Sequence, residues 1–173
     1  TFIQTCNYIS MEAAHFATKA PGSWKGESAS FEELADYGKT LSAVKAFPVI
    51  ADFPKGKNAP YVEYKFVAAS EGVKQFDFYL NPSNPAYKDN KLAFIAEVNG
   101  DKIQKDLVDA KNFAVGDNQW TWGNDITNNI RIASVYADCR QGLNILRVYP
   151  VTPNIVLQKI VVHNANEPFP YSY

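Results

Sequence analysis

Short runs of alternating apolar and polar residues, separated by turn residues, constrain this chain more than any other feature of its sequence. In residues 61–67 the apolar side chains of Val62, Tyr64 and Phe66 fall at every second position. Side chains of an extended strand alternate between its two faces, so these three share one face. Residues 73–80 alternate more loosely. Both segments are predicted to be β-strands, the first with one buried face.

A hairpin signal follows in the middle of the chain. Residues 92–98 form an apolar run, and Asn99-Gly100 comes directly after it. Both residues of an Asn-Gly pair tolerate the positive φ angles that a two-residue hairpin turn requires. The sequence therefore predicts a strand over 92–98, a tight turn, and a return strand over 102–107.

Further strand-like runs occupy residues 130–136, 144–149 and 155–162, and Gln141-Gly142 marks a turn between the first two. The run at 130–136 leaves a helix open as an alternative. Together with a first strand that starts at Tyr8, the chain has seven or eight short strands and almost no helix. Many short strands separated by turn signals are typical of an all-β antiparallel sandwich, which is the predicted fold class.

One short helical turn is predicted within this β-structure. Ser30 and Glu33 have the spacing of a capping box, in which two side chains hydrogen-bond to free backbone N–H groups at a helix start. The apolar face of residues 30–35 is only two residues wide. An irregular loop is therefore the alternative for this segment.

Length and charge limit the classes of function. A chain of 173 residues is most simply one domain, and we assign residues 1–165 to it and residues 166–173 to a tail or linker remnant. The 17 basic and 18 acidic residues give a net charge of −1, which leaves no basic field for nucleic acid or an anionic membrane. No apolar run reaches the length of about 18 residues that a membrane span needs. The first residue is Thr1 rather than Met, which favours a processed product or an excised domain.

Recognisable catalytic machinery is missing from the sequence. His15 and His163 do not form a zinc-binding pattern, and the chain has neither a Gly-rich phosphate loop nor a nucleophile elbow. Glycosidases use two carboxylates across a cleft, but nothing in the spacing of the acidic residues selects a pair. The acidic residues considered are Glu32, Glu33, Asp106, Asp109, Asp117 and Asp125. Cys6 and Cys139 allow one disulfide. Their spacing in the sequence does not determine whether the two sulfur atoms lie close enough to bond.

Residues 119–131 combine aromatic and polar side chains in a way that suits sugar binding. Sugars present C–H faces that pack on aromatic rings, and hydroxyl groups that hydrogen-bond to amides and guanidinium groups. Both kinds of partner are present in Trp120, Trp122, Asn124, Asn128, Asn129 and Arg131. Arg131 could also pair with a uronate carboxylate through two parallel hydrogen bonds. In the alternative interpretation, one tryptophan fills the end of the sandwich and the asparagines satisfy the loop backbone.

A set of segments spread over residues 8–173 carries a family resemblance. The segments are Ile9-Ser-Met-Glu-Ala-Ala-His-Phe, Trp24, Tyr37-Gly-Lys-Thr-Leu-Ser-Ala-Val, Phe47-Pro48, Trp120, Asn129-Ile-Arg-Ile and Val156-Leu-Gln-Lys-Ile-Val-Val. In this order they resemble the C-terminal domain of glycoside hydrolase family 115. The enzymes of that family are α-glucuronidases, which remove glucuronic or 4-O-methylglucuronic acid from xylan and related polysaccharides.

The resemblance implies an accessory module of a hydrolase. In that family the catalytic domains lie upstream of this region, so no catalytic residue is transferred to this chain. More distantly, the strand start at Glu12-Ala13 and the hairpin at Val98-Asn-Gly resemble galactose-binding-type sandwiches with a jelly-roll fold, including family 6 and family 35 carbohydrate-binding modules. In many such sandwiches an early Glu ligates a structural calcium ion, which makes Glu12 a calcium candidate. The next position on its face is Ala14, which offers no oxygen ligand. No other cofactor is expected.

These observations lead to one prediction and two alternatives. We predict a non-catalytic module of a secreted or periplasmic protein, which binds acidic, glucuronoxylan-type fragments of plant polysaccharides. The first alternative is a structural domain that packs on the catalytic domain or forms a homodimer, favoured by the aromatic residues Phe31, Tyr37, Phe47 and Phe53 and by the Tyr-rich tail. The second alternative is an enzyme in its own right, and we expect no turnover.

Overall fold

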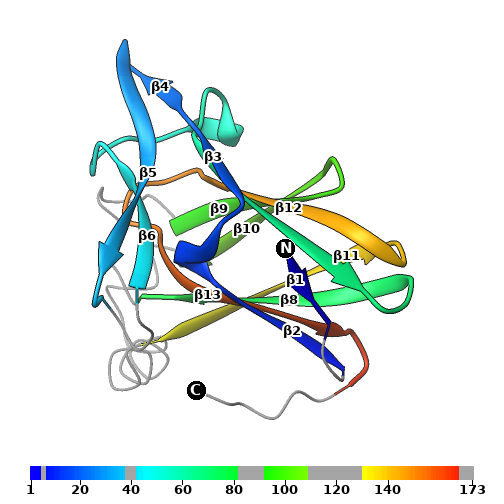
Figure 1. Ribbon diagram of the computed structural model, residues 1–173. Coiled ribbons are helices and arrows are strands. Elements are labelled where there is room, and N and C mark those ends of the chain that lie inside the picture. Colours follow the sequence, from blue (N-terminus) through cyan, green and yellow to red (C-terminus); the bar gives the residue numbers. More distant parts are fainter. Residues whose placement is uncertain (5–6, 38–41, 82–91, 109–129, 168–173) are drawn as a thin grey trace, which may run out of the picture.

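The computed structural model describes residues 1–4, 7–37, 42–81, 92–108 and 130–167 (Figure 1). The strands in the first part of the chain are β1 (Phe2–Ile3), β2 (Tyr8–Glu12), β3 (Thr18–Ala20), β4 (Gly22–Trp24), β5 (Glu27–Ala35) and β6 (Ser42–Phe47). The later strands are β7 (Tyr61–Ala68), β8 (Gly72–Leu80), β9 (Leu92–Val98), β10 (Asp101–Val108), β11 (Arg131–Cys139), β12 (Gly142–Pro150) and β13 (Val156–Asn164). Two short 3-10 helices are η1 (Ala13–His15) and η2 (Pro54–Gly56). No helix in these described ranges is long and apolar enough to cross a membrane.

The strands form two sheets that pack against each other (Figure 1). The first sheet has the order β1-β7-β12-β9-β10, and β3 also pairs with β7. The second sheet has the order β11-β8-β13-β6-β5-β4, and β2 also pairs with β13. Among the described pairings, β1 and β7 run parallel and the others run antiparallel. This arrangement confirms the predicted antiparallel sandwich, whereas the boundary between the domain and a tail at 166–173 stays a prediction.

The main core lies between the two sheets, and alternation along the strands builds it. Val62, Tyr64 and Phe66 of β7 are all fully buried, as their spacing predicts. Phe78 of β8 and Phe94 of β9 meet from opposite sheets, with their ring centres 4.8 Å apart. Removal of apolar surface from water is the main favourable term in folding, so these inward-facing rows account for the sandwich.

The hairpin predicted at Asn99-Gly100 joins β9 and β10. Both residues have positive φ, 51° for Asn99 and 99° for Gly100, as a type I′ turn requires. Pairing of the two strands begins with Val98 opposite Asp101. The run at 130–136 is likewise a strand, β11, and not the helix that was left open as its alternative.

The helical turn predicted at residues 30–35 is wrong, because this segment belongs to strand β5. β5 pairs with β6 over the whole of 30–35 and with β4 at its start. Ser30 does not cap a helix: its Oγ donates to the Glu32 carboxylate at 2.5 Å, since residues two positions apart share one face of a strand. Phe31 between them points into the main core. Cross-strand pairing and the burial of Phe31 outweigh the local capping signal.

A second, smaller apolar cluster lies on the outer face of the first sheet. Its buried members are Ala29, Ala51, Phe53, Ala59, Ala93, Ile95, Tyr149 and Val151, and Trp24 and Tyr61 pack against them. Gly22 allows β4 to approach this region closely, because a β-carbon there would lie 2.2 Å from the Asn58 carbonyl oxygen. Phe31 and Phe53 are each 1% exposed, one in each cluster, so the interpretation of these two rings as part of an exposed docking patch is wrong.

Candidate functional site

Most residues of the predicted sugar site lie outside the part of the chain that the structure describes. These residues are Trp120, Trp122, Asn124, Asn128 and Asn129. The remaining member, Arg131, is the first residue of β11 and is half-buried. Its Nη2 group donates a hydrogen bond to the backbone carbonyl oxygen of Leu107 in β10. Because β10 belongs to the first sheet and β11 to the second, this bond links the two sheets and orients the Arg131 side chain.

Glu12, the calcium candidate, ends β2 and has a buried carboxylate oxygen, Oε2, without a hydrogen-bond partner. Such an oxygen calls for an explanation, and a bound cation is one. The neighbouring positions do not complete a calcium site, since Ala14 has no side-chain oxygen and the residue opposite Glu12 on β13 is the cation Lys159. Within the described ranges, no group of three or more His, Cys, Asp or Glu side chains could hold a metal ion. Calcium takes about six to eight oxygens, so the described residues do not fit this ion.

A buried polar network lies on the face of the second sheet that points away from the main core. Asp77 of β8 accepts hydrogen bonds from Ser134 Oγ at 2.6 Å and Gln75 Nε2 at 2.8 Å, and its other oxygen lies 3.0 Å from His163 Nε2. The second ring nitrogen of His163 lies 3.0 Å from the carbonyl oxygen of Asn164. In a catalytic triad the histidine stands between the serine and the aspartate, whereas here the aspartate is central. The network therefore ties β8, β11 and β13 together and is not a triad.

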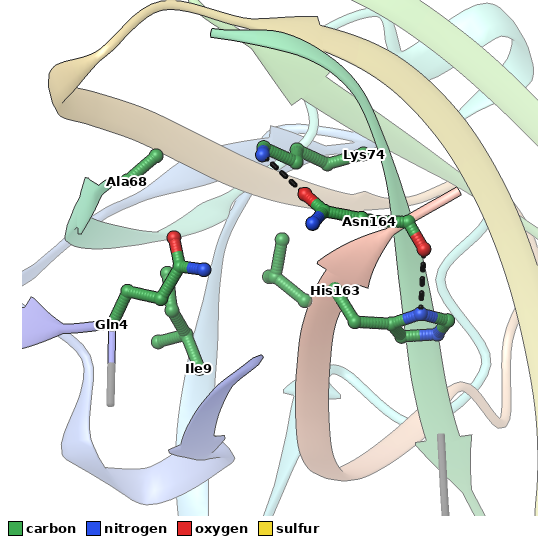
Figure 2. Close-up of a pocket in the computed structure, with 7 residues that line it drawn as sticks. Gln4, Ile9, Ala68, Lys74, His163 and Asn164 are labelled. Carbon is green, nitrogen blue, oxygen red and sulfur yellow. Dashed lines mark hydrogen bonds between the residues drawn. The ribbon is translucent and has the colours of Figure 1, made fainter. Parts of the chain in front are cut away.

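Figure 2 shows a hollow lined by Gln4, Ile9, Ala68, Lys74, Val162, His163 and Asn164. Lys74 is 4% exposed, and its ammonium group donates to Asn164 Oδ1 at 2.5 Å and to Ser70 Oγ at 2.9 Å. Hydrogen bonds of this kind offset part of the cost of removing the charge from water. The hollow has no room for a water molecule, so it is not a ligand site.

Cys139 is buried and forms no disulfide with any residue in the described ranges. Burial raises the pKa of this thiol to about 11, so it stays protonated and unreactive near neutral pH. Cys6 lies outside the described residues, and the pairing of the two cysteines stays open.

A cluster of rings and charges lies on the outer face of the first sheet, and we call it the aromatic–cation cluster. It consists of Tyr61, Glu63, Glu97, Lys102, Arg147 and Tyr149. Arg147 of β12 stands in register with Glu63 of β7 on one side and with Glu97 of β9 on the other. Its Nε donates to Glu63 Oε2 at 2.8 Å, and its Nη1 donates to Glu97 Oε1 at 3.4 Å. The guanidinium carbon lies 4.8 Å from the centre of the Tyr61 ring, a cation–π contact.

Lys102 of β10 is the second cation of the cluster and stands in register with Glu97. Its Nζ lies 3.6 Å from Glu97 Oε2 and 4.8 Å from the centre of the Tyr149 ring. The Tyr149 hydroxyl donates to Glu97 Oε2 at 3.1 Å. The ring centres of Tyr61 and Tyr149 are 5.3 Å apart, at an angle of 51°. Each of two neighbouring rings thus holds one cation over its face.

Depth separates the charges of the cluster into two layers. The side chains of Glu63 and Glu97 are 8% and 10% exposed, whereas those of Arg147 and Lys102 are 35% and 57% exposed. The hydrogen bond to Glu63 raises the pKa of Arg147 above its already high usual value. Burial, followed by the charge of Glu97, raises the pKa of Tyr149, so its hydroxyl stays protonated and remains a donor. The cluster therefore presents cations to solvent above buried carboxylates.

Sequence reasoning did not single out these residues, although part of the signal was available. Tyr61 and Glu63 lie on the face opposite the predicted core residues of the strand over 61–67, and Arg147 and Tyr149 lie two positions apart in the run 144–149. The pairing of β7 with β12 brings Glu63 and Arg147 together across 84 positions of the chain. No local pattern shows that pairing.

The whole sequence supports a family assignment. The family model of the Glycosyl hydrolase family 115 C-terminal domain matches residues 1–173. The chain belongs to this family. The match confirms the resemblance inferred from the sequence segments, and we refer to the chain below as the family 115 C-terminal domain. A search of curated proteins gives no match.

Solved structures share the sandwich of the family 115 C-terminal domain at low sequence identity. A family 35 carbohydrate binding module from Clostridium thermocellum is similar with a TM-score of 0.58 and 15% identity, over 92% of this chain and 100% of that one. An exo-beta-1,3-galactanase from Phanerochaete chrysosporium has a TM-score of 0.59 at 15% identity, over 92% of this chain and 30% of that enzyme. A family GH115 4-O-methyl-alpha-glucuronidase, BtGH115A, with specificity for decorated arabinogalactans, has a TM-score of 0.60 at 11% identity, over 94% of this chain and 18% of that enzyme. These likenesses establish the fold, and the chain spans less than a third of either enzyme.

Proposed function

We propose that the family 115 C-terminal domain is a non-catalytic module of a secreted or periplasmic α-glucuronidase and binds acidic, glucuronoxylan-type fragments of plant polysaccharides. The observation that carries the proposal is family membership over the whole chain, in a sandwich similar to that of a family 35 carbohydrate-binding module. A module that holds a polysaccharide raises the effective concentration of that substrate near a linked catalytic domain. Binding without turnover is thus a sufficient role.

The proposed contact with the glycan consists of Trp120, Trp122, Asn124, Asn128, Asn129 and Arg131, which we call the Trp120–Arg131 set. In this proposal the indole rings pack on the C–H faces of sugar rings, and the asparagine amides hydrogen-bond to hydroxyl groups. Arg131 supplies charge-assisted hydrogen bonds to a uronate carboxylate. Its bond to the Leu107 carbonyl oxygen supports this role, because a held side chain loses less entropy when a ligand binds.

Calorimetric titration with 4-O-methylglucuronoxylo-oligosaccharides tests the proposal, with neutral xylo-oligosaccharides as the comparison ligand. Trp120→Ala and Trp122→Ala are each expected to weaken binding about tenfold, because loss of an aromatic hot spot costs about 1–2 kcal/mol. Tyr136→Ala is the matched control, since this ring is 54% exposed on β11 and lies outside the Trp120–Arg131 set. The affinity measured in the presence of calcium is expected to equal the affinity measured in EDTA. Unchanged binding by both tryptophan variants would make the site assignment wrong, and no binding by the unmodified chain would make the function wrong.

An apolar row on the first sheet favours a second candidate function, docking onto the catalytic domain of the parent enzyme. Ile3 of β1 and Leu143 of β12 stand in register on either side of Val67 of β7. Ile3 is 70% exposed and Leu143 is 47% exposed. Contiguous exposed apolar surface is typical of contact sites between proteins. Self-association of the isolated chain in sedimentation experiments, abolished by Leu143→Lys, is expected in this alternative, whereas a monomer that binds glycan contradicts it.

A further inference from the structure

We infer that the aromatic–cation cluster is a second binding site, selective for the carboxylate group of an acidic sugar. The inference rests on the proposed function, because it supplies a carboxylate receptor to a module that binds acidic glycans. It differs from that proposal in its residues, since the cluster lies on the outer face of the first sheet and shares no residue with the Trp120–Arg131 set.

The cluster offers hydrogen-bond donors to a ligand, and each of its two carboxylates already accepts a hydrogen bond from Arg147. Arg147 uses Nε and Nη1 for the two carboxylates, and its guanidinium also hydrogen-bonds to the Tyr149 side chain. A guanidinium has five N–H donors, so donors remain for a ligand. Lys102 is 57% exposed, and its 3.6 Å ion pair with Glu97 is longer than a hydrogen bond. Glu63 and Glu97 are the buried layer. A sugar hydroxyl both donates and accepts, whereas a carboxylate only accepts, so a surface that offers donors suits a carboxylate.

Three adjacent strands determine the spacing of the two cations. Arg147, Glu97 and Lys102 stand in one row across β12, β9 and β10. Neighbouring strands lie about 4.8 Å apart, so the backbones that carry the cations are about 10 Å apart, with Glu97 midway. Both side chains lean toward Glu97, at 3.4 Å for Arg147 and 3.6 Å for Lys102. An anionic group placed between the exposed ends of the two side chains therefore meets both cations at once, on the solvent side of the Glu97 carboxylate that they share.

The aromatic rings of the cluster favour a sugar that carries a carboxylate over a small inorganic anion. Tyr61 and Tyr149 hold the cations over their faces, which limits the side-chain freedom that binding would otherwise remove. Tyr61 is half-buried, so part of this residue reaches the surface beside Arg147. A uronic acid matches this pair of features, since it carries an apolar C–H face and a carboxylate on one ring.

Titration of the whole chain with sodium glucuronate in low-salt buffer tests the inference, with glucose as the neutral comparison. Arg147→Lys keeps a cation beside both glutamates but removes the planar fork, and it is expected to weaken glucuronate binding about tenfold to a hundredfold. Lys102→Gln removes one exposed charge and is expected to weaken binding about three- to tenfold. Lys57→Gln, at an exposed lysine next to η2, is the matched control and is expected to bind as the unmodified chain does.

Thermal unfolding of each variant separates loss of the site from loss of the fold, because Arg147 also ties three strands together. If Arg147→Lys does not fold, the glucuronate affinity of Lys102→Gln decides the test. Unchanged affinity in both variants overturns the inference, and so does glucose binding that equals glucuronate binding. Loss of glucuronate binding in Arg131→Lys alone overturns the inference and leaves the proposed function standing. Absence of binding to both glucuronate and glucuronoxylo-oligosaccharides overturns both.

Discussion

Replacing Asp77 by alanine is expected to lower the free energy of unfolding by about 3–5 kcal/mol, because the change removes a carboxylate to which three side chains hydrogen-bond. Asp77 is 5% exposed and joins Ser134, Gln75 and His163 across three strands of the second sheet. Removal of the carboxylate leaves the His163 ring buried, and Gln75 and Ser134 half-buried, without this acceptor. A buried group without its hydrogen bond costs more than the bond itself contributes. Since small domains are stable by only about 5–15 kcal/mol, this loss is a large part of the total.

Urea denaturation followed by circular dichroism measures the effect. Asp138→Ala is the matched control, because Asp138 is an exposed carboxylate on β11, and its change is expected to stay within about 0.5 kcal/mol. If Asp77→Ala and Asp138→Ala shift the midpoint equally, the buried network does not stabilise the second sheet.

Phe78→Ala is expected to destabilise the sandwich by about 3–5 kcal/mol, through lost burial and the cavity left behind. Phe78 is fully buried, and its ring meets Phe94 of the opposite sheet at 4.8 Å between centres. The contact is one of those that hold the two sheets together. The same denaturation experiment is expected to show a lower midpoint with an unchanged slope, because the surface exposed on unfolding stays similar.

Tyr136→Ala serves as the control for the loss of an aromatic ring. Tyr136 lies on β11 in the same sheet but is 54% exposed, so its loss is expected to cost less than about 0.5 kcal/mol. A Phe78→Ala variant as stable as Tyr136→Ala would show that the contact between the sheets does not depend on this ring.

Much of the fold could be predicted because strand formation here follows from local residue order. The alternation of Val62, Tyr64 and Phe66 predicts a strand and its buried face, and Asn99-Gly100 predicts a hairpin from φ angles alone. The prediction failed at residues 30–35, where a capping signal over four residues competes with pairing to β6. That pairing depends on a partner strand that the sequence pattern did not reveal.

The candidate site shows a similar division. The aromatic and amide residues of the Trp120–Arg131 set could be named from composition and spacing, and their role stays a prediction. The aromatic–cation cluster could not be assembled in this way, because its residues come from β7, β9, β10 and β12. Polar residues on the outer face of a strand have no period that reveals their neighbours across a sheet, since the core constrains only the inward face.

The sequence by itself determined that this chain is an all-β sandwich of the glycoside hydrolase family 115 C-terminal domain, because periodicity, turn residues and ordered segments are properties of local residue order. The tertiary structure alone decided which outward-facing residues meet. Glu63 and Arg147 are 84 positions apart, and only the pairing of β7, β12 and β9 aligns them with Glu97 in one row. Strand register is a cooperative result of packing the whole core, and no single strand carries enough information to specify it.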